Sequence, residues 1–170
     1  MRLRPVRPSD VWAIVEGCTD PLTQLYTRIP SPYTAEDGRA FVGGAAGRRI
    51  LGEAIDLAIT RPGDDHLAGV VGINMDRHDP RRGEIGYWIG PADRGRGLAG
   101  AALALMSRWA LTAAGLERLD LQAALGNGAS IRTAERCGYV REGTMRDAWF
   151  RGPARTDMAL FSLLPGDLSD

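Results

Sequence analysis

One stretch of the chain decides its fold: Gly90-Pro91-Ala92-Asp93-Arg94-Gly95-Arg96-Gly97-Leu98-Ala99-Gly100. It follows a strand-like run, residues 84–89, and opens a strongly helical run, residues 98–114. Its glycines permit a tight turn and a close approach of the backbone to a ligand. The start of a helix leaves N–H groups without partners, and these donors and the helix dipole suit a phosphate. Arg94 and Arg96 add positive charge, so the stretch predicts a site for a phosphorylated ligand.

The segments on either side of this loop predict a mixed α/β fold. Strand signals lie at residues 2–6, 53–60, 67–75, 84–89, 118–124, 139–145 and 158–164. Helices are expected to begin at residues 8–10 and to cover 35–47 (capped by Thr34), 98–114 and 129–137. The proline-rich segment 19–34 is expected to be ordered but irregular. Short polar turns at 61–65 and 76–83 favour antiparallel strands first, and the later pattern favours βαβ connections.

Composition limits the class of protein. The chain has 170 residues, 44% of them hydrophobic, which is enough for one core, and no linker or repeat divides the single domain expected over residues 1–170. A net charge of zero gives no global attraction to nucleic acid or to an acidic membrane. No apolar run is long enough for a membrane span or a signal peptide, so a cytoplasmic protein is expected.

Two further chemistries are disfavoured by the residue types present. The two cysteines are far apart and the two histidines are isolated, so no metal site is expected. All 21 basic residues are arginine, so the chain cannot form a lysine Schiff base.

The glycine loop has two interpretations. Residues 95–100 match the dinucleotide-binding pattern GxGxxG, and Asp120 lies twenty residues further on. That pattern normally occupies the first βα turn of a doubly wound sheet, whereas here several hairpin-like strands precede it. Asp120 also stands near the start of its strand, and only 70 residues follow Gly100. A nicotinamide cofactor is therefore the weaker interpretation.

The stronger interpretation comes from the segment 84–139, which resembles the GNAT superfamily of acyl-CoA-dependent N-acyltransferases. Residues 94–99 fit its phosphate-loop pattern, Arg/Gln-x-x-Gly-x-Gly/Ala, and residues 127–139 fit the segment after the next strand. Asn127 and Ser130, in an Asn-x-x-Ser pattern, and the strand Gly-Tyr-Trp-Ile at 86–89 are similar to the branch that acetylates protein N-termini, including those of ribosomal proteins. Segments 30–34 and 142–146 also resemble that branch.

The resemblance implies a GNAT-like central mixed sheet with flanking helices, in which antiparallel N-terminal strands precede a βαβ half that binds acetyl-CoA. The pyrophosphate would lie on the amides of the glycine loop, and the pantetheine arm would pair with the strand that ends at Trp88-Ile89. Asn127 would hold that arm from the other side, although Asn127-Gly128 also fits a simple turn. The implied cofactor-binding residues are Trp88, Ile89, Arg94, Gly95, Arg96, Gly97, Leu98, Ala99, Gly100, Asn127 and Ser130.

The implied reaction is direct attack of a neutral amine on the thioester. Glu84 is the candidate base, acting through water, or else a solvated carboxylate near a strand end. Ser130 is the candidate for hydrogen-bonding the leaving sulfur, or else only caps its helix. Many relatives use a tyrosine where this chain has Ala134, and part of the branch uses a glutamate where it has Trp149. Three aromatic positions are expected either to form walls of the pocket or to pack against neighbouring turns: Trp149-Phe150, Tyr26 and Tyr33.

These features predict an acetyl-CoA-dependent N-acetyltransferase that acts on a protein or peptide α-amine. A small-molecule amine such as an aminoglycoside, a polyamine or an amino-acid derivative is the alternative acceptor. A catalytically silent acyl-CoA-binding module is the alternative of a different class. Members of this branch often form dimers, so a homodimer is possible, without nucleic acid or membrane partners.

Overall fold

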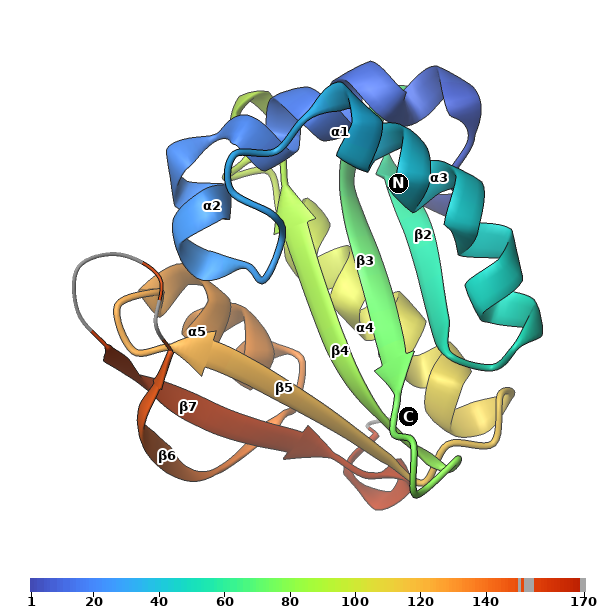
Figure 1. Cartoon of the computed structure of the whole chain (residues 1–170). Coiled ribbons are helices and arrows are strands. Elements are labelled where there is room, and N and C mark those ends of the chain that lie inside the picture. The colour runs from blue at the N-terminus through green and yellow to red at the C-terminus, as the bar shows by residue number, and fades with distance from the viewer. Residues whose placement is uncertain (150, 152–154, 169–170) are drawn as a thin grey trace.

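The computed structural model describes residues 1–149, 151 and 155–168. Seven strands form one sheet in the order β1-β2-β3-β4-β5-β7-β6 (Figure 1). The strands are β1 (Arg2–Pro5), β2 (Ala54–Thr60), β3 (Leu67–Met75), β4 (Arg82–Ile89), β5 (Arg118–Ala124), β6 (Val140–Trp149) and β7 (Thr156–Leu163). The α-helices are α1 (Val11–Thr19), α2 (Pro21–Tyr26), α3 (Ala35–Ile50), α4 (Leu98–Thr112) and α5 (Gly128–Arg136). All strand pairs are antiparallel except β4 and β5, which are parallel. The mixed α/β prediction is therefore confirmed.

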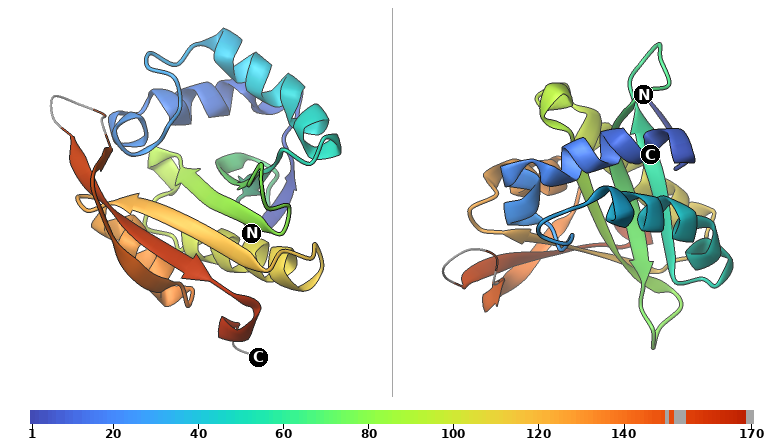
Figure 2. Two further views of the ribbon diagram at one scale, coloured as in Figure 1. Left: turned by 60° about the horizontal axis from the view of Figure 1, so that its bottom comes forward. Right: turned by 45° about the horizontal axis from the view of Figure 1, so that its top comes forward.

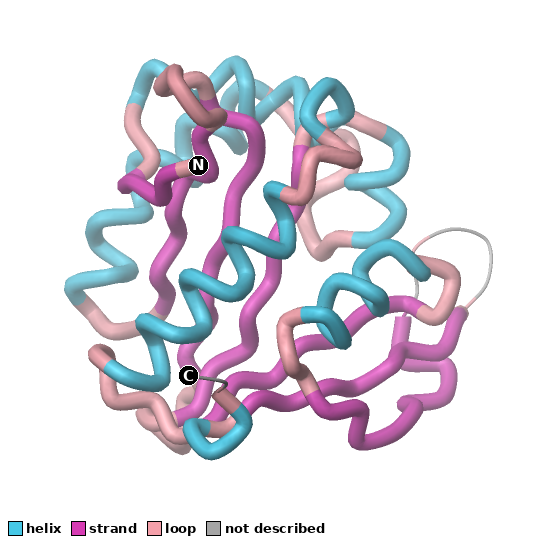
Figure 3. Tube along the Cα trace, turned by 180° about the vertical axis from the view of Figure 1, so that it is seen from behind, coloured by secondary structure: helices cyan, strands magenta, loops and turns pink. Residues whose placement is uncertain are grey.

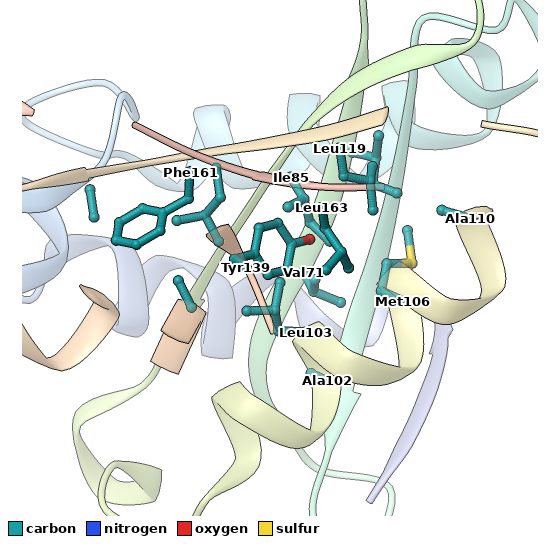
Figure 4. Close-up of a cluster of buried hydrophobic side chains, with 14 of the residues drawn as sticks. Val71, Ile85, Ala102, Leu103, Met106, Ala110, Leu119, Tyr139, Phe161 and Leu163 are labelled. Atoms are coloured by element: carbon teal, nitrogen blue, oxygen red, sulfur yellow. The ribbon is translucent and has the colours of Figure 1, made fainter. Parts of the chain in front are cut away.

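Helices cover both faces of the sheet. Helices α1 and α3 lie over β2 and β3 on one face, and α4 crosses the other face, as the views from two further directions and from behind make plain (Figures 2 and 3). The larger core cluster packs α4 against the sheet and includes Leu103, Met106, Ile85, Leu119 and Phe161 (Figure 4). A second cluster packs α1 and α3 against the opposite face. Strands β2, β3 and β4 therefore send side chains to both cores.

Strand β4 pairs very differently with its two neighbours. Its residues 83–89 are in register with residues 69–75 of β3 along nearly the whole strand. With β5 only residues 82–84 pair, opposite residues 118–120. Beyond that point β4 and β5 have no backbone pairing, which leaves the end of β4 open to the extended arm that the resemblance implies.

Two local predictions are confirmed by the caps of the helices. Thr34 caps α3: its hydroxyl accepts from the Asp37 amide at 3.2 Å, and the Asp37 carboxylate accepts from the Thr34 amide at 2.8 Å. This reciprocal pair is a capping box, which satisfies two amides that the first helical turn leaves free. Gly97, at φ 75°, occupies the N-cap of α4 in the left-handed conformation that glycine adopts readily.

The expectation of an irregular segment over residues 19–34 is wrong for its first part, which forms α2. Asp20 caps this helix by accepting a hydrogen bond from the Thr23 amide at 3.0 Å, and Pro21 takes the first helical position. Proline is favoured there because its fixed φ suits a helix and its missing N–H is not needed. Asp-Pro was therefore a helix-start signal.

The strand expected over residues 84–89 begins two residues earlier, at Arg82, so Glu84 is the third residue of β4.

Candidate active site

A cavity of about 810 Å³ opens where β4 and β5 diverge. It is lined by residues of α2, β4, the glycine loop, β5 and α5. Of the residues predicted from the sequence, the lining includes Glu84, Trp88, Ile89, Arg94, Gly95, Gly97, Leu98, Ala99, Gly100, Asn127 and Ser130. Arg96 is the exception, because it does not line the cavity. Its side chain is exposed, with a guanidinium nitrogen 3.6 Å from a carboxylate oxygen of Asp93. The fold thus brings two distant motifs to one cavity.

The glycine loop presents free backbone donors to this cavity. Gly95 and Gly97 both have φ 75°, and a Cβ placed on either would meet nothing within 4 Å. The Ala101 amide donates to the Gly97 carbonyl at 3.1 Å, and no side chain caps α4. The amides of residues 98–100 precede the first possible partner within the helix, so they can receive an anion at the positive end of α4.

Arg94 has a structural task that its sequence position does not reveal. Its guanidinium contacts the Asp20 carboxylate and donates to the Thr23 hydroxyl at 3.0 Å and to the Ile89 carbonyl at 3.0 Å. These bonds tie the start of α2 to the end of β4. The side chain of Arg94 is therefore committed to holding one wall of the cavity, which leaves the main chain of the loop to contact a phosphate.

Two arginines of α5 that sequence reasoning missed also line the cavity. Arg132 and Arg136 are exposed and lie four residues apart on the helix, on the side that faces the cavity. Residues at this spacing share one face of a helix. The signal was present in the sequence as two arginines following Asn127 at helical spacing. They place positive charge beside the free amides of the glycine loop.

Glu84 lies in the lining but has partners. Arg28 donates to the Glu84 carboxylate at 2.8 Å and to the side-chain carbonyl of Gln122 at 2.9 Å. The Gln122 amide also approaches Glu84, at 3.3 Å. The side chain of Arg28 is 58% exposed and that of Glu84 34%, so this ion pair faces solvent and is weak. Nothing local in the sequence announced Arg28, which is 56 residues from Glu84.

Ser130 stands in the first turn of α5. Its amide donates to the Asn127 side chain at 3.2 Å, so Asn127 does cap the helix, as its alternative interpretation required. The Ser130 hydroxyl lies 3.0 Å from that of Tyr87 on β4, and burial raises the pKa of Tyr87. The sequence missed Tyr87 as a site residue. Ala134 is fully buried, which agrees with the absence of a hydroxyl at that position.

The predicted aromatic walls had mixed outcomes. Trp149 and Tyr26 line the cavity; Trp149 is 6% exposed and its indole donates to the Leu25 carbonyl at 2.9 Å. Tyr33 is instead 7% exposed within the α1–α3 core, so its prediction as a wall is wrong. Phe150 lies outside the described residues.

The described part of the chain holds no group of three or more His, Cys, Asp or Glu side chains that could bind a metal ion. Among the same residues, no helix has the length and apolar character needed to cross a membrane.

Known proteins resemble this chain in sequence and in fold. YdaF of Bacillus subtilis, provisionally assigned as a ribosomal N-acetyltransferase, is 34% identical over 102 residues, which span 59% of this chain and 55% of that protein. The ribosomal-protein-serine acetyltransferase of Escherichia coli is 28% identical over 164 residues, which span 90% of each chain. The structure of RimL, a ribosomal L7/L12 alpha-N-protein acetyltransferase in complex with coenzyme A, has the same fold, with a TM-score of 0.83 at 24% identity over 95% of this chain and 92% of that one.

A model of the acetyltransferase (GNAT) domain matches residues 1–140, most of the chain. The sheet with its splayed β4–β5 pair and the cavity at the glycine loop agree with that match. The protein therefore belongs to the GNAT family of acetyltransferases, enzymes that take the acetyl group from acetyl-CoA.

Proposed function

We propose that this protein acetylates the α-amine of a protein or peptide N-terminus, with Glu84 as base and Ser130 beside the leaving sulfur. One observation carries the proposal: both side chains line a single cavity that passes between β4 and β5. Glu84 and Trp88 lie four positions apart on β4, so their side chains share one face of the sheet, and Trp88 packs with the α1–α3 cluster there. Tyr87, the partner of Ser130, points to the other face and packs with the α4 cluster. Glu84 and Ser130 thus approach the opening from opposite faces of the sheet.

The residues present fit acetyl-CoA. The amides of residues 98–100 suit a pyrophosphate at the start of α4, and Arg132 and Arg136 add charge for the phosphates. The unpaired edge of β4 beyond Glu84 offers backbone groups to an extended amide-containing arm. When bound, the group supplies an acetyl thioester as the acyl donor. The proposed cofactor-binding residues are those predicted from the sequence. Arg96 is included only through its main-chain amide, because its side chain is exposed, and the Arg94 side chain acts on α2.

The proposed steps use groups on the two sides of the opening. The incoming amine displaces Arg28 from Glu84, which is feasible because an exposed ion pair contributes at most about 1 kcal/mol. Glu84 then accepts a proton from the amine through a water molecule. On the other side, the Ser130 hydroxyl donates a hydrogen bond to the sulfur as negative charge develops there.

The α-amine is the preferred acceptor for two reasons. The Escherichia coli relative is named as a ribosomal-protein-serine acetyltransferase, and the name of YdaF from Bacillus subtilis includes ribosomal N-acetyltransferase. An α-amino group has a reference pKa near 8, against about 10.4 for lysine, so a carboxylate acting through water can deprotonate it more readily.

A small cationic amine is the second candidate. Asp56 joins Glu84 in the cavity lining. Gly72 leaves room for the Asp56 carboxylate, and Gly86, its partner on β4, leaves open space in the cavity. Two carboxylates beside this space would favour a di- or polyamine. Asp56 is partly neutralised by Arg48, which donates to it at 2.9 Å.

The test is acetyl-CoA-dependent thiol release with a panel of amines and a control without amine. The panel holds peptides with Ser, Ala and Met N-termini, an aminoglycoside, spermidine and several amino acids. Turnover confined to peptides supports the proposal, and turnover confined to small amines overturns the acceptor assignment while keeping the chemistry. Glu84→Gln and Ser130→Ala should each lower kcat while the protein still binds acetyl-CoA. Unchanged activity in both variants would remove the roles assigned to them.

A further inference from the structure

We propose that Tyr87 is a positioning residue that fixes the Ser130 hydroxyl toward the leaving sulfur. The inference rests on the proposed role of Ser130 and extends it to Tyr87, a residue of β4 that the sequence did not assign to the site. The Tyr87 hydroxyl reaches Ser130 of α5 from β4.

The geometry of the pair carries the argument. Tyr87 Oη and Ser130 Oγ are 3.0 Å apart, within hydrogen-bonding distance, and both residues line the cavity. Their bond joins β4 to α5 on the far side of the opening, in a region where β4 has no backbone partner on β5. The contact therefore depends on both sides of the opening keeping their positions.

Either hydroxyl can donate in this hydrogen bond, and we assign the shared proton to Tyr87 because of the acidity of the two groups. A phenol, with a pKa of about 10, is a better donor than an aliphatic hydroxyl. Burial raises the pKa of Tyr87, so the phenol keeps its proton at neutral pH and can donate it to Ser130. With its oxygen already accepting, Ser130 directs its own proton elsewhere, and the cavity is where a new acceptor would lie. Linked hydrogen bonds polarise one another, which strengthens the serine as a donor.

A second tyrosine–serine pair, Tyr139 and Ser107, provides a comparison in which the same hydrogen bond lies away from the cavity. Tyr139 and Ser107 lie 2.7 Å apart, are 4% and 1% exposed, and belong to the core behind the sheet, outside the cavity lining. The two pairs have the same chemistry, although Tyr87 and Ser130 are only half-buried, whereas Tyr139 and Ser107 are fully buried. Only the Tyr87 pair adjoins the cavity, so Tyr139→Phe is a matched control.

The decisive measurement is the pKa of the thiol of coenzyme A bound to the protein, followed by the ultraviolet absorbance of the thiolate. A donor that stabilises the thiolate lowers this pKa. The same titration with desulfo-coenzyme A subtracts the signal of Cys18 and Cys137. Ser130→Ala should raise the pKa of the bound thiol by about one unit, as expected for loss of one charge-assisted hydrogen bond. Tyr87→Phe should raise it by about half as much, and Tyr139→Phe should leave it unchanged.

The double variant separates positioning from direct contact. If Tyr87 acts through Ser130, adding Tyr87→Phe to Ser130→Ala should raise the thiol pKa no further. With an active amine, Tyr87→Phe should also lower kcat about fivefold with little change in KM for acetyl-CoA. A full additional shift in the double variant, or no shift in Tyr87→Phe, would overturn the proposal. An unshifted Ser130→Ala would overturn the role of Ser130 and this inference with it. The titration needs no acceptor, so failure of the α-amine assignment does not affect it.

Discussion

The two edges of β4 illustrate how one strand can serve stability on one side and ligand binding on the other. Toward β3, residues 83–89 are paired in continuous register. Toward β5, pairing stops after Glu84, and the cavity opens there. Glycines occur on both sides of this comparison, and their surroundings differ. Gly69 of β3 lies where backbones crowd together, whereas Gly86 of β4, beyond the last residue that pairs with β5, lines the cavity and leaves space in it.

The largest expected effect comes from filling the closed edge. A Cβ on Gly69 would lie 2.2 Å from the Trp88 carbonyl oxygen, and backbone cannot move aside as a flexible side chain can. Gly69→Ala should lower the free energy of unfolding by about 3 kcal/mol or more, at the upper end of overpacking effects. Urea unfolding measures this change.

The matched change on the open side is Gly86→Val. A Cβ on Gly86 meets nothing within 4 Å, and the residue lines the cavity. The variant should unfold at nearly the wild-type urea concentration and should lose most of its amine-dependent thiol release. Equal destabilisation by Gly69→Ala and Gly86→Val would remove the distinction between the two edges.

The next effect concerns ligand binding at the end of the open edge. Gly97→Val forces a side chain into a left-handed conformation at the start of α4, which costs about 1–3 kcal/mol and places atoms over the free amides. Acetyl-CoA should no longer raise the melting temperature, because ligand-linked stabilisation requires binding.

Gly63→Val is the control, since Gly63 has φ 84° and open surroundings in a distant turn. It carries the same backbone strain and should keep the full acetyl-CoA shift. A normal shift in Gly97→Val would mean that the cofactor binds elsewhere.

Features that depend on local sequence patterns were predictable, and contacts that only the tertiary fold creates were not. The elements, the parallel neighbours β4 and β5 and the glycine loop depend on local patterns, so they were predictable. The helix α2 was missed because prolines outweighed the Asp20-Pro21 start signal. Arg28 and Tyr87 could not be found, because each meets its partner only through the tertiary fold, 56 residues away in one case and 43 in the other. Tyr33, expected at the pocket, is drawn into the α1–α3 core.

A smaller effect on the free energy of unfolding should distinguish Arg94 from Arg96, the two arginines of the glycine loop. Arg94→Ala removes the bonds that hold Asp20, Thr23 and Ile89 together and leaves the Asp20 carboxylate, 12% exposed, without its cation. We expect a loss of about 1–3 kcal/mol in unfolding free energy together with weaker acetyl-CoA binding, because α2 forms a cavity wall. Arg96→Ala, at an exposed position, should change stability by less than about 0.5 kcal/mol. Urea unfolding and calorimetric titration distinguish the two, and equal effects would contradict the structural task of Arg94.

The smallest effect concerns the open half of the sheet, β5, β7 and β6, which pairs with β4 only through residues 118–120 of β5. A chain of side-chain contacts crosses the strands there: Arg118 on β5 donates to both oxygens of Glu142 on β6, at 2.9 and 2.7 Å, and Ser162 on β7 donates to Glu142 at 2.7 Å. These bonds, with that of Arg118 first, lower the pKa of Glu142 from 4.5 to about 2. Because the folded-state pKa is lowered, the stabilisation is complete above pH 4.5 and is lost as the pH falls toward 2.

Glu142→Gln should therefore make stability less dependent on pH between about 4.5 and 2 than it is in the wild type, as measured by urea midpoints across that window. Glu117→Gln, which removes the carboxylate of an exposed pair with Arg81, is the control. The carboxylate of Glu142 is partly exposed, so screening by water should keep the change modest. If Glu142→Gln and the wild type lost stability in parallel on acidification, this ion pair would contribute nothing to the open half. The backbone ladder between β5, β7 and β6 alone would then hold it.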